Sequence, residues 1–412
     1  MSQNSLGKSH IKIVLLEGIH ESAVDAFHAD GYSSVERHQQ ALQGPALASA
    51  IRDAHIVGIR SATQLDRAAL ASADKLIAAG CFCIGTNQVD LAAAELHGVP
   101  VFNAPFSNTR SVAELVLAEI VFLLRGIPAR NAAAHRGVWS KTATGSREAR
   151  GKTLGIVGYG HIGTQIGVLA ESLGMHVIFY DIETKLALGN ARQVPSLGDV
   201  CAASDVVTCH VPETPATRHL INAATIAAMR AGSCLINASR GQVVDIDALD
   251  AALASGHIAG AAIDVFPIEP SSAAEEFRSP LRGRDNVLLT PHIGGSTAEA
   301  QRDIGVEVAT KLIRYSNNGS TLGAVNFPEV SLPAHPGQQR LLHIHRNRPG
   351  VLSLVNSALS DERINICGQY LQTTAAIGYV VIDIDSPERA VSQELRRRLE
   401  GIDGTIRTRI LF

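Results

Sequence analysis

The sequence predicts an α/β protein with two doubly wound parallel-sheet domains and a smaller C-terminal domain. Short apolar strands alternate with helical patterns along most of the chain, which is the order of a parallel sheet covered by helices. One of these strands runs into a helix through a glycine-spaced turn. After residue 339 the pattern becomes strand, helix, two strands, helix, strand, which predicts a separate ferredoxin-like fold.

The composition indicates sizeable apolar cores and a small-molecule partner. The chain has 412 residues, 46% of them hydrophobic and 18% charged, which suits two to three domains. The net charge of −3 offers no electrostatic footprint for nucleic acid or an anionic membrane, so we expect neither as a partner. The six cysteines lack metal-ligand spacing, and we expect no metal site and no disulfide.

We expect a cytoplasmic protein. The polar N-terminus, Met1 to His10, lacks the apolar stretch of a signal peptide. The most apolar segment, Val112 to Leu124, contains Glu114 and Glu119 and is too short and too charged to span a bilayer.

The first domain is expected over residues 1–107 and is completed by residues 297–333. A helix beginning at Glu21 separates the first two apolar strands. The expected strands are Ile11–Leu16, Ile56–Ile59 and Lys75–Ala79. This spacing predicts parallel strands joined by helical crossovers.

The second domain is expected over residues 108–296. Ser111 and Glu114 have the spacing of a capping box, which predicts that a helix opens there and continues through Leu124. The polar segment Asn131–Arg150 then leads into the second sheet. The expected strands are Thr153–Val157, His176–Tyr180, Val206–Cys209, Cys234–Asn237, Ala261–Ile263 and Val287–Leu289.

The third domain is expected over residues 339–412. It follows the expected helix Thr297–Tyr315 and the turn-rich linkers Ser316–Ser320 and Leu332–Gly337. The expected elements are strand Arg340–His345, helix Gly350–Leu359, strand Ile364–Thr373, strand Ile377–Asp383, helix Glu388–Leu399 and strand Thr405–Leu411. This βαββαβ order is the ferredoxin-like split βαβ arrangement.

The glycine-spaced turn predicts a dinucleotide site. The glycines Gly158, Gly160 and Gly163 permit a tight turn, close approach of a pyrophosphate and close helix packing, and the helix N-terminus supplies N–H donors. Asp181 closes the next strand, where its carboxylate can accept hydrogen bonds from ribose hydroxyls and would repel a 2′-phosphate. We therefore predict NAD as the cofactor. A glycine-rich turn alone can be purely structural, but the strand, helix and acidic residue here follow in the order of a nucleotide-binding unit.

Polar residues follow three buried-looking strands of the second domain, namely Arg240, Asp264 and His292. Because the carboxyl ends of parallel strands form one ligand crevice, we expect these residues to share a site. Glu269 lies in the proline-flanked loop after Asp264. Each could instead be an ordinary surface residue, and their joint position beside a nucleotide site is what favours catalysis.

These residue types suit hydride chemistry on a secondary alcohol. A base near neutrality must take the hydroxyl proton, which we assign to His292, and a carboxylate such as Glu269 would orient the imidazole and favour the imidazolium. The planar guanidinium of Arg240 can hold an α-carboxylate through two parallel hydrogen bonds. We therefore predict Arg240, Glu269 and His292 as the catalytic residues.

The motifs around these residues resemble the D-isomer-specific 2-hydroxyacid dehydrogenases, and among them the members with one C-terminal ACT domain. The resemblance covers nearly the whole chain, through the motifs Gly80–Asn87, Asn103–Glu114, Asn237–Gly241, Asp264–Phe266 and Pro291–Ser296. It implies NAD-dependent oxidation of 3-phosphoglycerate to 3-phosphohydroxypyruvate, the entry step of serine biosynthesis. It also implies a homotetramer and feedback inhibition by L-serine.

The resemblance assigns roles to domains and residues. The first domain would bind the substrate, the second would bind NAD, and the third would be the ACT regulatory domain. The implied catalytic triad is Arg240, Glu269 and His292. The implied cofactor contacts are His161, Ile162, Asp181, Ala238, Ser239, Arg240, Asp264, His292, Ile293, Gly294 and Gly295.

The resemblance also implies substrate and effector residues. Arg60, Ser61 and Asn108 match substrate-facing positions, and Lys141 lies in a segment that reaches a neighbouring subunit. In the third domain, the side chains of two asparagines and one histidine could bind L-serine across an edge-to-edge dimer of these domains. These three residues could also be plain turn residues. The implied effector residues are His345, Asn347 and Asn365.

Two alternative functions are open at this point. The fold and triad are common to enzymes that act on glyoxylate, hydroxypyruvate, another D-2-hydroxy acid or 2-oxoglutarate. Gln39 and Ala62 stand where close relatives have additional basic residues near the substrate phosphate. The other alternative is an NAD-sensing corepressor-like binding protein, although a structured small-molecule module at the C-terminus suits a metabolic enzyme better than a partner-binding tail would.

Overall fold

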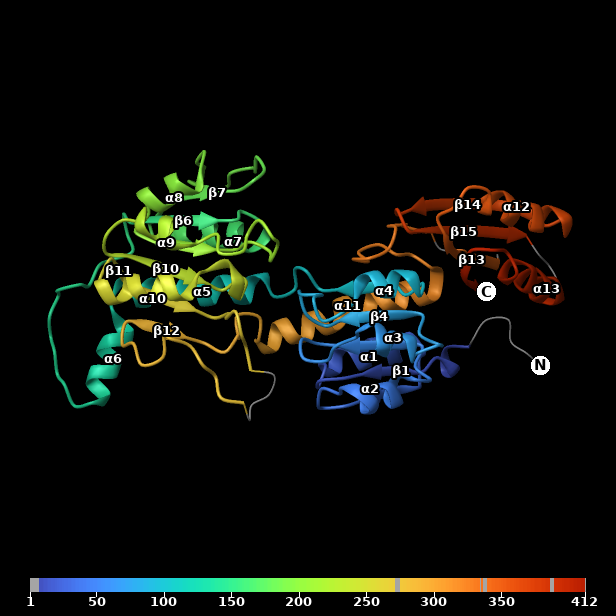
Figure 1. Ribbon diagram of the computed structural model, residues 1–412, viewed down its shortest axis with the longest axis horizontal. Coiled ribbons are helices and arrows are strands. Elements are labelled where there is room, and N and C mark those ends of the chain that lie inside the picture. The colour runs from blue at the N-terminus through green and yellow to red at the C-terminus, as the bar shows by residue number, and fades with distance from the viewer. Residues whose placement is uncertain (1–6, 271–274, 334, 336–338, 386–388, 412) are drawn as a thin grey trace. The chain divides into compact units, whose positions relative to one another are not determined.

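The computed structural model describes residues 7–270, 275–333, 335, 339–385 and 389–411 (Figure 1). Contacts between residues divide the chain into two compact units. Unit 1 contains the residues up to 107 and those from 301 onward, and unit 2 contains residues 108–300. Within the described residues, no helix is both long enough and apolar enough to cross a bilayer.

Unit 1 contains a parallel five-stranded sheet in the order β2-β1-β3-β4-β5. Its strands are β1 (Ile13–Leu15), β2 (Val35–Arg37), β3 (Ile56–Ile59), β4 (Ala78–Cys81) and β5 (Val101–Asn103), and a 3-10 turn, η1 (Lys8–His10), precedes them. The covering helices are α1 (Glu21–Ala29), α2 (Gly44–Ile51), α3 (Arg67–Ala71), α4 (Leu91–Leu96) and α11 (Ala298–Asn318). One apolar core joins α1 and α11 to the sheet, and a second core joins α2, α3 and α4 to its other face.

The strands of this sheet were predictable where both faces are buried. The prediction for β3 is confirmed at both ends. The predicted strand Lys75–Ala79 is wrong at its start, because β4 begins at Ala78 and the exposed Lys75 precedes it in a loop. β2 was not predicted, since this edge strand is largely exposed and lacks an apolar signal.

Unit 2 contains a parallel seven-stranded sheet in the order β12-β11-β10-β9-β6-β7-β8. Its strands are β6 (Thr153–Val157), β7 (His176–Tyr180), β8 (Arg192–Gln193), β9 (Val206–Cys209), β10 (Ser233–Asn237), β11 (Ile258–Ile263) and β12 (Val287–Leu289). The helices are α5 (Thr109–Leu124), α6 (Ile127–His135), α7 (His161–Ser172), α8 (Leu197–Ala203), α9 (Ala223–Ala227) and α10 (Ile246–Ser255), with a 3-10 turn η2 (Gly241–Val243). Helices α5 and α7 pack on one face, and α8, α9 and α10 pack on the other.

The capping box predicted at Ser111 is wrong. Helix α5 begins earlier, at Thr109, and ends at Leu124 as predicted. The Ser111 hydroxyl oxygen instead lies 2.7 Å from that of Thr297, and Glu114 pairs with an arginine one turn before it. Both side chains therefore have partners other than the free N–H groups of the helix.

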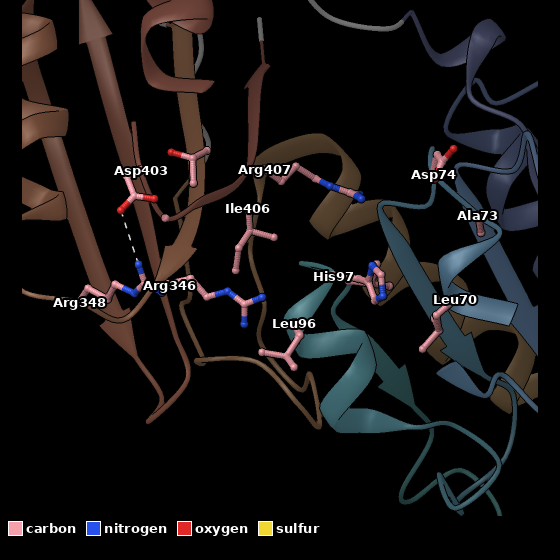
Figure 2. A pocket seen from close by; sticks show the side chains of 13 residues that line it. Leu70, Ala73, Asp74, Leu96, His97, Arg346, Arg348, Asp403, Ile406 and Arg407 are labelled. Carbon is pink, nitrogen blue, oxygen red and sulfur yellow. Dashed lines mark ion pairs between the residues drawn. The ribbon is translucent and has the colours of Figure 1, made fainter. Parts of the chain in front are cut away.

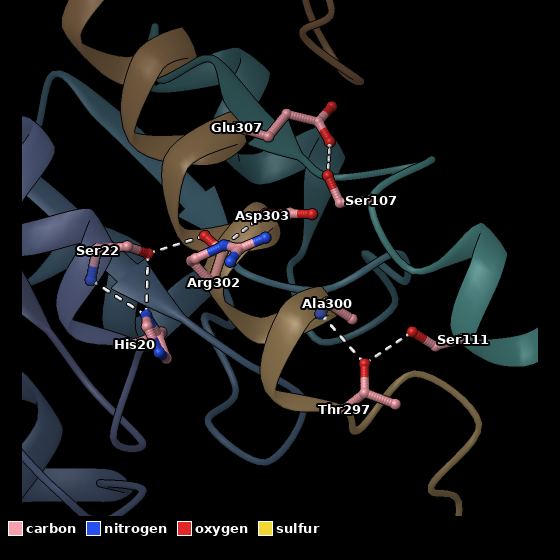
Figure 3. A network of polar contacts seen from close by, with 9 residues as sticks. All are labelled: His20, Ser22, Ser107, Ser111, Thr297, Ala300, Arg302, Asp303 and Glu307. Carbon is pink, nitrogen blue, oxygen red and sulfur yellow. Dashed lines mark hydrogen bonds and ion pairs between the residues drawn. The ribbon is translucent and has the colours of Figure 1, made fainter.

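The chain passes between the two units at residues 107–108 and 300–301, and each unit fastens its own side of these crossings (Figure 3). On the unit 1 side, the hydroxyl of Ser107 donates to the carboxylate of Glu307 on α11. On the unit 2 side, Thr297 accepts a hydrogen bond from the backbone of Ala300 at 3.2 Å while its hydroxyl contacts α5. The ends of the connecting segments are therefore fixed by side chains as well as by helical backbone.

The C-terminal part of unit 1 has the predicted βαββαβ order and an antiparallel sheet in the order β14-β15-β13-β16. Its elements are β13 (Gln339–Arg346), α12 (Val351–Asp361), β14 (Asn365–Thr373), β15 (Ile377–Asp385), α13 (Arg389–Glu400) and β16 (Thr405–Leu411). The predicted start of the last helix, Glu388, lies outside the described residues. Helices α12 and α13 cover one face of this sheet.

The other face of the C-terminal sheet packs against the first domain. Leu342, Tyr379 and Leu411 belong to the same apolar core as Phe102 and Phe327. The rings of Phe327 and Tyr379 meet edge to face, with centroids 5.9 Å apart. The two parts of unit 1 therefore share a continuous core.

A buried ion pair fixes the start of β13. The guanidinium of Arg340 is fully buried and donates to both carboxylate oxygens of Asp383, at 2.6 and 2.8 Å. Its remaining nitrogen donates to the backbone carbonyls of Asn318 and Pro333. The pair thus connects two strands of the C-terminal sheet to the linker that leads into it.

We predict that Arg340→Ala destabilises the protein by about 3–5 kcal/mol, because it leaves the Asp383 carboxylate buried without a partner. Denaturant unfolding followed by circular dichroism measures the change. Arg67→Ala is the matched control, since Arg67 is 75% exposed and lies 3.8 Å from Asp90, and it should cost less than about 1 kcal/mol. Equal effects of the two substitutions would contradict the prediction.

Candidate active site

The glycine-spaced turn after β6 forms a cradle that side chains would fill. A Cβ on Gly158, whose φ is +91°, would lie 2.5 Å from the carbonyl oxygen of His210. A Cβ on Gly163 would lie 2.2 Å from the carbonyl oxygen of Gly158, so α7 packs directly on the turn. Gly160 instead faces open space. These are the three roles that a pyrophosphate-binding turn requires of its glycines.

Helix α7 begins directly after this turn, so its first N–H groups and its positive dipole end face the open space. The predicted contacts His161 and Ile162 are its first two residues. Asp181, at the end of β7, accepts the N–H of Tyr159 at 2.9 Å and the N–H of Glu183 at 3.1 Å. Its carboxylate is thus fixed beside the turn, and the arrangement fits an NAD molecule with its ribose hydroxyls at Asp181.

The turn after β10 is shaped by Asn237. The Asn237 amide oxygen accepts the N–H and the hydroxyl of Ser239 at 3.1 and 2.8 Å, and its nitrogen donates to the carbonyl of Arg240 at 3.0 Å. A Cβ on the next residue, Gly241, would lie 2.0 Å from the carbonyl oxygen of Phe266. The loops after β10 and β11 therefore touch. Ala238 and Ser239, which directly follow β10, are mostly buried.

Asp264 holds the loop that follows β12. Its carboxylate is buried and accepts the Thr290 hydroxyl at 2.7 Å and the N–H groups of Ile293 and Gly294 at 2.8 and 2.9 Å. The Asp264 carbonyl also accepts the N–H of His292 at 2.8 Å. Direct contact of Asp264 with the cofactor stays a prediction, since these bonds give it a supporting role for residues 290–294.

The predicted base and its carboxylate partner meet in the structure. His292 Nδ1 lies 2.9 Å from Glu269 Oε2, and the other carboxylate oxygen of Glu269 accepts the N–H of Phe266 at 3.0 Å. Because an ionised carboxylate only accepts, Nδ1 donates and Nε2 is left to exchange protons. The backbone of His292 has φ +53°, a conformation uncommon for residues other than glycine.

This contact shifts both pKa values in the directions that a base and its partner need. The hydrogen bond to Glu269 raises the pKa of His292 above its ordinary value, against the opposing effect of burial. Burial alone raises the pKa of Glu269, but the hydrogen bonds from His292 and from the Phe266 backbone outweigh it, so that pKa is lowered. An ionised Glu269 thus stabilises a protonated His292.

Arg240 is close enough to influence both groups. Its positive charge lowers the pKa of Glu269 and opposes the rise in the pKa of His292. One nitrogen of its guanidinium donates to the carbonyl of Ser239 at 2.7 Å. Among the described residues Arg240 forms no ion pair, so its other donors can serve an incoming carboxylate.

A buried acid that the sequence did not single out lies in α5. Glu119 is 3% exposed, and its Oε2 has no hydrogen-bond partner among the described residues. Burial, with a smaller effect from the negative charge of Asp264, raises the pKa of Glu119 to about 8. This shift favours the protonated, uncharged form of Glu119 near neutral pH.

The predicted substrate residues Arg60 and Ser61 lie in unit 1, in the loop after β3. The carboxylate of Glu17 holds this loop by accepting the backbone N–H groups of Arg60, Ala62 and Thr63 at 2.9–3.0 Å. The amide of Gln88 donates to the carbonyl of Arg60 at 2.6 Å. The loop backbone is therefore rigidly held, while the Arg60 side chain is half-exposed.

The other two predicted substrate residues lie in unit 2. Asn108 precedes α5, and its buried Oδ1 has no partner among the described residues. A Cβ on Gly295 would lie 2.3 Å from Asn108 Nδ2, so Asn108 lies against the loop after β12 that contains His292. Lys141 is exposed between α6 and β6, and within the described structure no hydrogen bond joins it to these residues.

The predicted effector residues differ in accessibility. Asn347 and Asn365 are exposed, and Asn347 donates to the carbonyl of Thr374 at 2.7 Å. His345 is 4% exposed, and its ring covers Gly378, where a Cβ would lie 2.3 Å from the imidazole. The two amides are thus the accessible part of the predicted effector site.

Sequence reasoning missed Glu17 and Asn237, although both stand at the carboxyl ends of strands and the same strand-end rule could have found them. It had no signal for Glu119, because a single acid inside an apolar helix usually reads as a surface residue. Within the described ranges, no group of His, Cys, Asp and Glu side chains could hold a metal ion.

Two families match parts of the chain. The family described as D-isomer specific 2-hydroxyacid dehydrogenase, NAD binding domain, matches residues 117–294. The AHAS small subunit-like ACT domain matches residues 341–407.

Relatives of known name extend the similarity to the whole chain. The chain is 61% identical over 412 residues to D-3-phosphoglycerate dehydrogenase of Escherichia coli K12, with 100% of both chains covered. It is 60% identical over 408 residues to D-3-phosphoglycerate dehydrogenase of Haemophilus influenzae, with 99% of each covered. Among solved structures, D-lactate dehydrogenase from Aquifex aeolicus, complexed with NAD and lactic acid, is similar with a TM-score of 0.66 at 26% identity, covering 74% of this chain and 95% of that chain.

We predict that Glu269→Gln lowers the pKa of His292, because the hydrogen bond to the carboxylate is the largest cause of its rise. NMR titration of the imidazole measures this directly. Glu276→Gln is the control, since Glu276 pairs with Arg282 at 2.9 Å and does not contact His292. An unchanged or raised pKa in Glu269→Gln would show that another group sets the protonation of His292.

Proposed function

The chain belongs to the D-isomer-specific 2-hydroxyacid dehydrogenase family, and we propose that it uses NAD to oxidise D-3-phosphoglycerate to 3-phosphohydroxypyruvate, the first step of serine biosynthesis. The observation that carries this proposal is the hydrogen bond between His292 and Glu269. It lies at the carboxyl edge of the sheet that also carries the glycine cradle after β6. A proton acceptor and a dinucleotide site at one edge are what alcohol oxidation needs.

Each catalytic side chain has one task in this reaction. Bound NAD supplies the acceptor for the hydride that leaves the carbinol carbon. His292 Nε2 takes the hydroxyl proton, and Glu269 stabilises the imidazolium that results. Arg240 binds the α-carboxylate and orients the alcohol carbon. In the reverse direction the protonated His292 returns the proton to the carbonyl oxygen.

The substrate phosphate distinguishes this reaction from those of other D-2-hydroxy acid dehydrogenases. We assign the phosphate to Arg60, together with Ser61 of the same loop, and the rest of the substrate to Asn108 and Lys141. The support for this assignment is the loop itself, whose backbone Glu17 and Gln88 hold in place while the Arg60 guanidinium stays accessible. A held loop with a partly exposed arginine suits an anionic group on the substrate.

Regulation, assembly and location complete the proposal. We assign L-serine as an inhibitor that binds Asn347 and Asn365 of the C-terminal domain, with His345 behind them. We also propose a homotetramer, which the adjacent exposed side chains of Val138 and Trp139, 53% and 90% exposed, support as a subunit contact. The reaction would take place in the cytoplasm, where the six cysteines stay reduced.

We predict NADH formation from 3-phosphoglycerate, with Arg60→Ala raising its KM about tenfold or more because a charged hydrogen bond to the phosphate is lost. Absorbance at the NADH band measures the initial rates. Arg52→Ala, an exposed arginine of the same domain, should leave the KM unchanged. An Arg60→Ala enzyme with the parent KM would remove the phosphate assignment. Turnover of glyoxylate, hydroxypyruvate or 2-oxoglutarate alone would favour another substrate, and an absence of any turnover would favour a binding protein.

We predict that L-serine lowers the rate of the parent enzyme and that Asn347→Ala weakens this inhibition, because an exposed amide that can bind the amino acid is removed. Serine titration of the NADH-forming assay measures the effect. Gln369→Ala is the control, since Gln369 is an exposed amide of the same domain that bonds to Asn356. Parent enzyme that does not respond to serine would overturn the regulatory assignment.

A further inference from the structure

A polar pocket of about 440 Å³ lies within unit 1, between the first domain and the C-terminal sheet (Figure 2). The first domain contributes residues from α3, α4 and the loops that follow them. The C-terminal domain contributes the end of β13 and the start of β16. None of the residues assigned above to catalysis, to substrate or to serine lines it.

The charged side chains of this pocket are mostly cationic. Its lining includes Arg346, Arg348 and Arg407, against Asp74 and Asp403. Arg348 and Asp403 face each other at 3.6 Å, where both are largely exposed. The two remaining arginines form no ion pair with any described residue, and one acid, Asp74, stands opposite them.

Of Arg346 and Arg407, Arg407 has the higher free-energy cost when its charge has no partner. Burial lowers the pKa of its guanidinium, which is the direction expected when a cation is taken out of water. Its side chain donates to the carbonyl of Leu76, a neutral acceptor, which leaves further donors of the guanidinium for another partner. Tyr315 opposes this lowering of the pKa of Arg407, and the nearby cation Arg409 adds a smaller lowering.

Arg346 and Arg407 line the same pocket. Figure 2 shows the side chains of Arg346 and Arg407 extending from the C-terminal sheet toward the first domain, where His97 stands opposite. Guanidinium groups hold phosphate and carboxylate oxygens through paired hydrogen bonds, which suits them to a compact anion. A long nucleic acid does not fit this picture, because the whole chain has a net charge of −3.

We propose that this pocket binds a small polyanion of the phosphate-ester class, held by Arg346 and Arg407 with His97 opposite. A ligand there contacts both the first domain and the C-terminal domain and holds them together. The site is an effector site distinct from catalysis, and it does not rest on the function proposed above. L-serine, which carries no net charge near neutral pH, is not its ligand.

Inorganic pyrophosphate is the test ligand, titrated into the full-length protein by isothermal titration calorimetry at constant ionic strength. Arg346→Gln should weaken its binding about tenfold or more, because a charged hydrogen bond is lost. Arg52→Gln, which removes the same charge from an exposed position outside the pocket, should leave the affinity unchanged. Arg407→Lys, which keeps the charge but loses the paired donors, should weaken binding as well and guards against a folding defect in one variant.

Asp74→Asn should change the pyrophosphate affinity in the opposite direction. Removing this negative charge from the pocket should tighten pyrophosphate binding about fivefold. Arg60→Ala should not change the pyrophosphate affinity, which separates this pocket from the substrate phosphate site. Unchanged binding in both Arg346→Gln and Arg407→Lys would overturn the proposal. Binding that Arg60→Ala alone abolishes, or heat that potassium chloride reproduces, would overturn it too.

Discussion

The candidate active site depends on the buried carboxylate of Asp264. It gathers one hydroxyl and two backbone N–H groups of residues 290–294, and its own carbonyl accepts the N–H of His292. His292 has a left-handed backbone, which costs of order 1–3 kcal/mol and persists only where surrounding bonds determine it. Without Asp264 this loop would lose the bonds that aim the imidazole at Glu269. The chemistry of one residue thus rests on the hydrogen bonds of another that need not touch the substrate.

Close backbone contact adds a second constraint at the same edge. Gly241 lies against the carbonyl of Phe266, and the N–H of Phe266 binds Glu269. The loops after β10 and β11 therefore contact each other and Glu269 through backbone groups. Unlike side chains, backbone groups do not change rotamer. This explains how Arg240 and Glu269, which are 29 positions apart in the printed sequence, can influence one titration. The parallel sheet brings the loops to one edge, and the absence of a Cβ lets them touch.

The strand-end rule accounts for what the sequence could predict. It predicts a shared site for Arg240, Asp264 and His292, because the carboxyl ends of neighbouring parallel strands meet, and Glu269 lies in the loop after Asp264. The His292–Glu269 contact is confirmed by the geometry. The rule could not assign hydrogen bonds, so the supporting role of Asp264 was not predicted. The capping box failed for a related reason, since local spacing at Ser111 carries no information about Thr297, 186 positions away.

The packing of the C-terminal domain against the first domain could not be predicted from local sequence patterns either. The alternation in β13 identifies one apolar face, but both faces are in fact buried, with α12 and α13 on one side and the first domain on the other. Arg340 is fully buried, and only its pairing with Asp383 makes this burial tolerable. Such pairing depends on antiparallel register, in which Arg340 lies opposite Asp383. Which residue of β15 lies opposite Arg340 depends on both strands together, so the sequence of β13 alone does not name the partner.

Two buried ionisable groups and a half-buried one, Arg407, show three ways of meeting the cost of leaving water. Arg340 has a carboxylate partner within hydrogen-bond distance. Glu119 has none, and its pKa rises to about 8, so it keeps its proton and avoids the charge. Arg407 can do neither, because a guanidinium does not give up its proton in proteins and no described carboxylate reaches it. A neutral carbonyl satisfies one donor but not the charge. An anion from solution would accept hydrogen bonds from the guanidinium and also balance its charge. The adjoining pocket provides the space for such an anion.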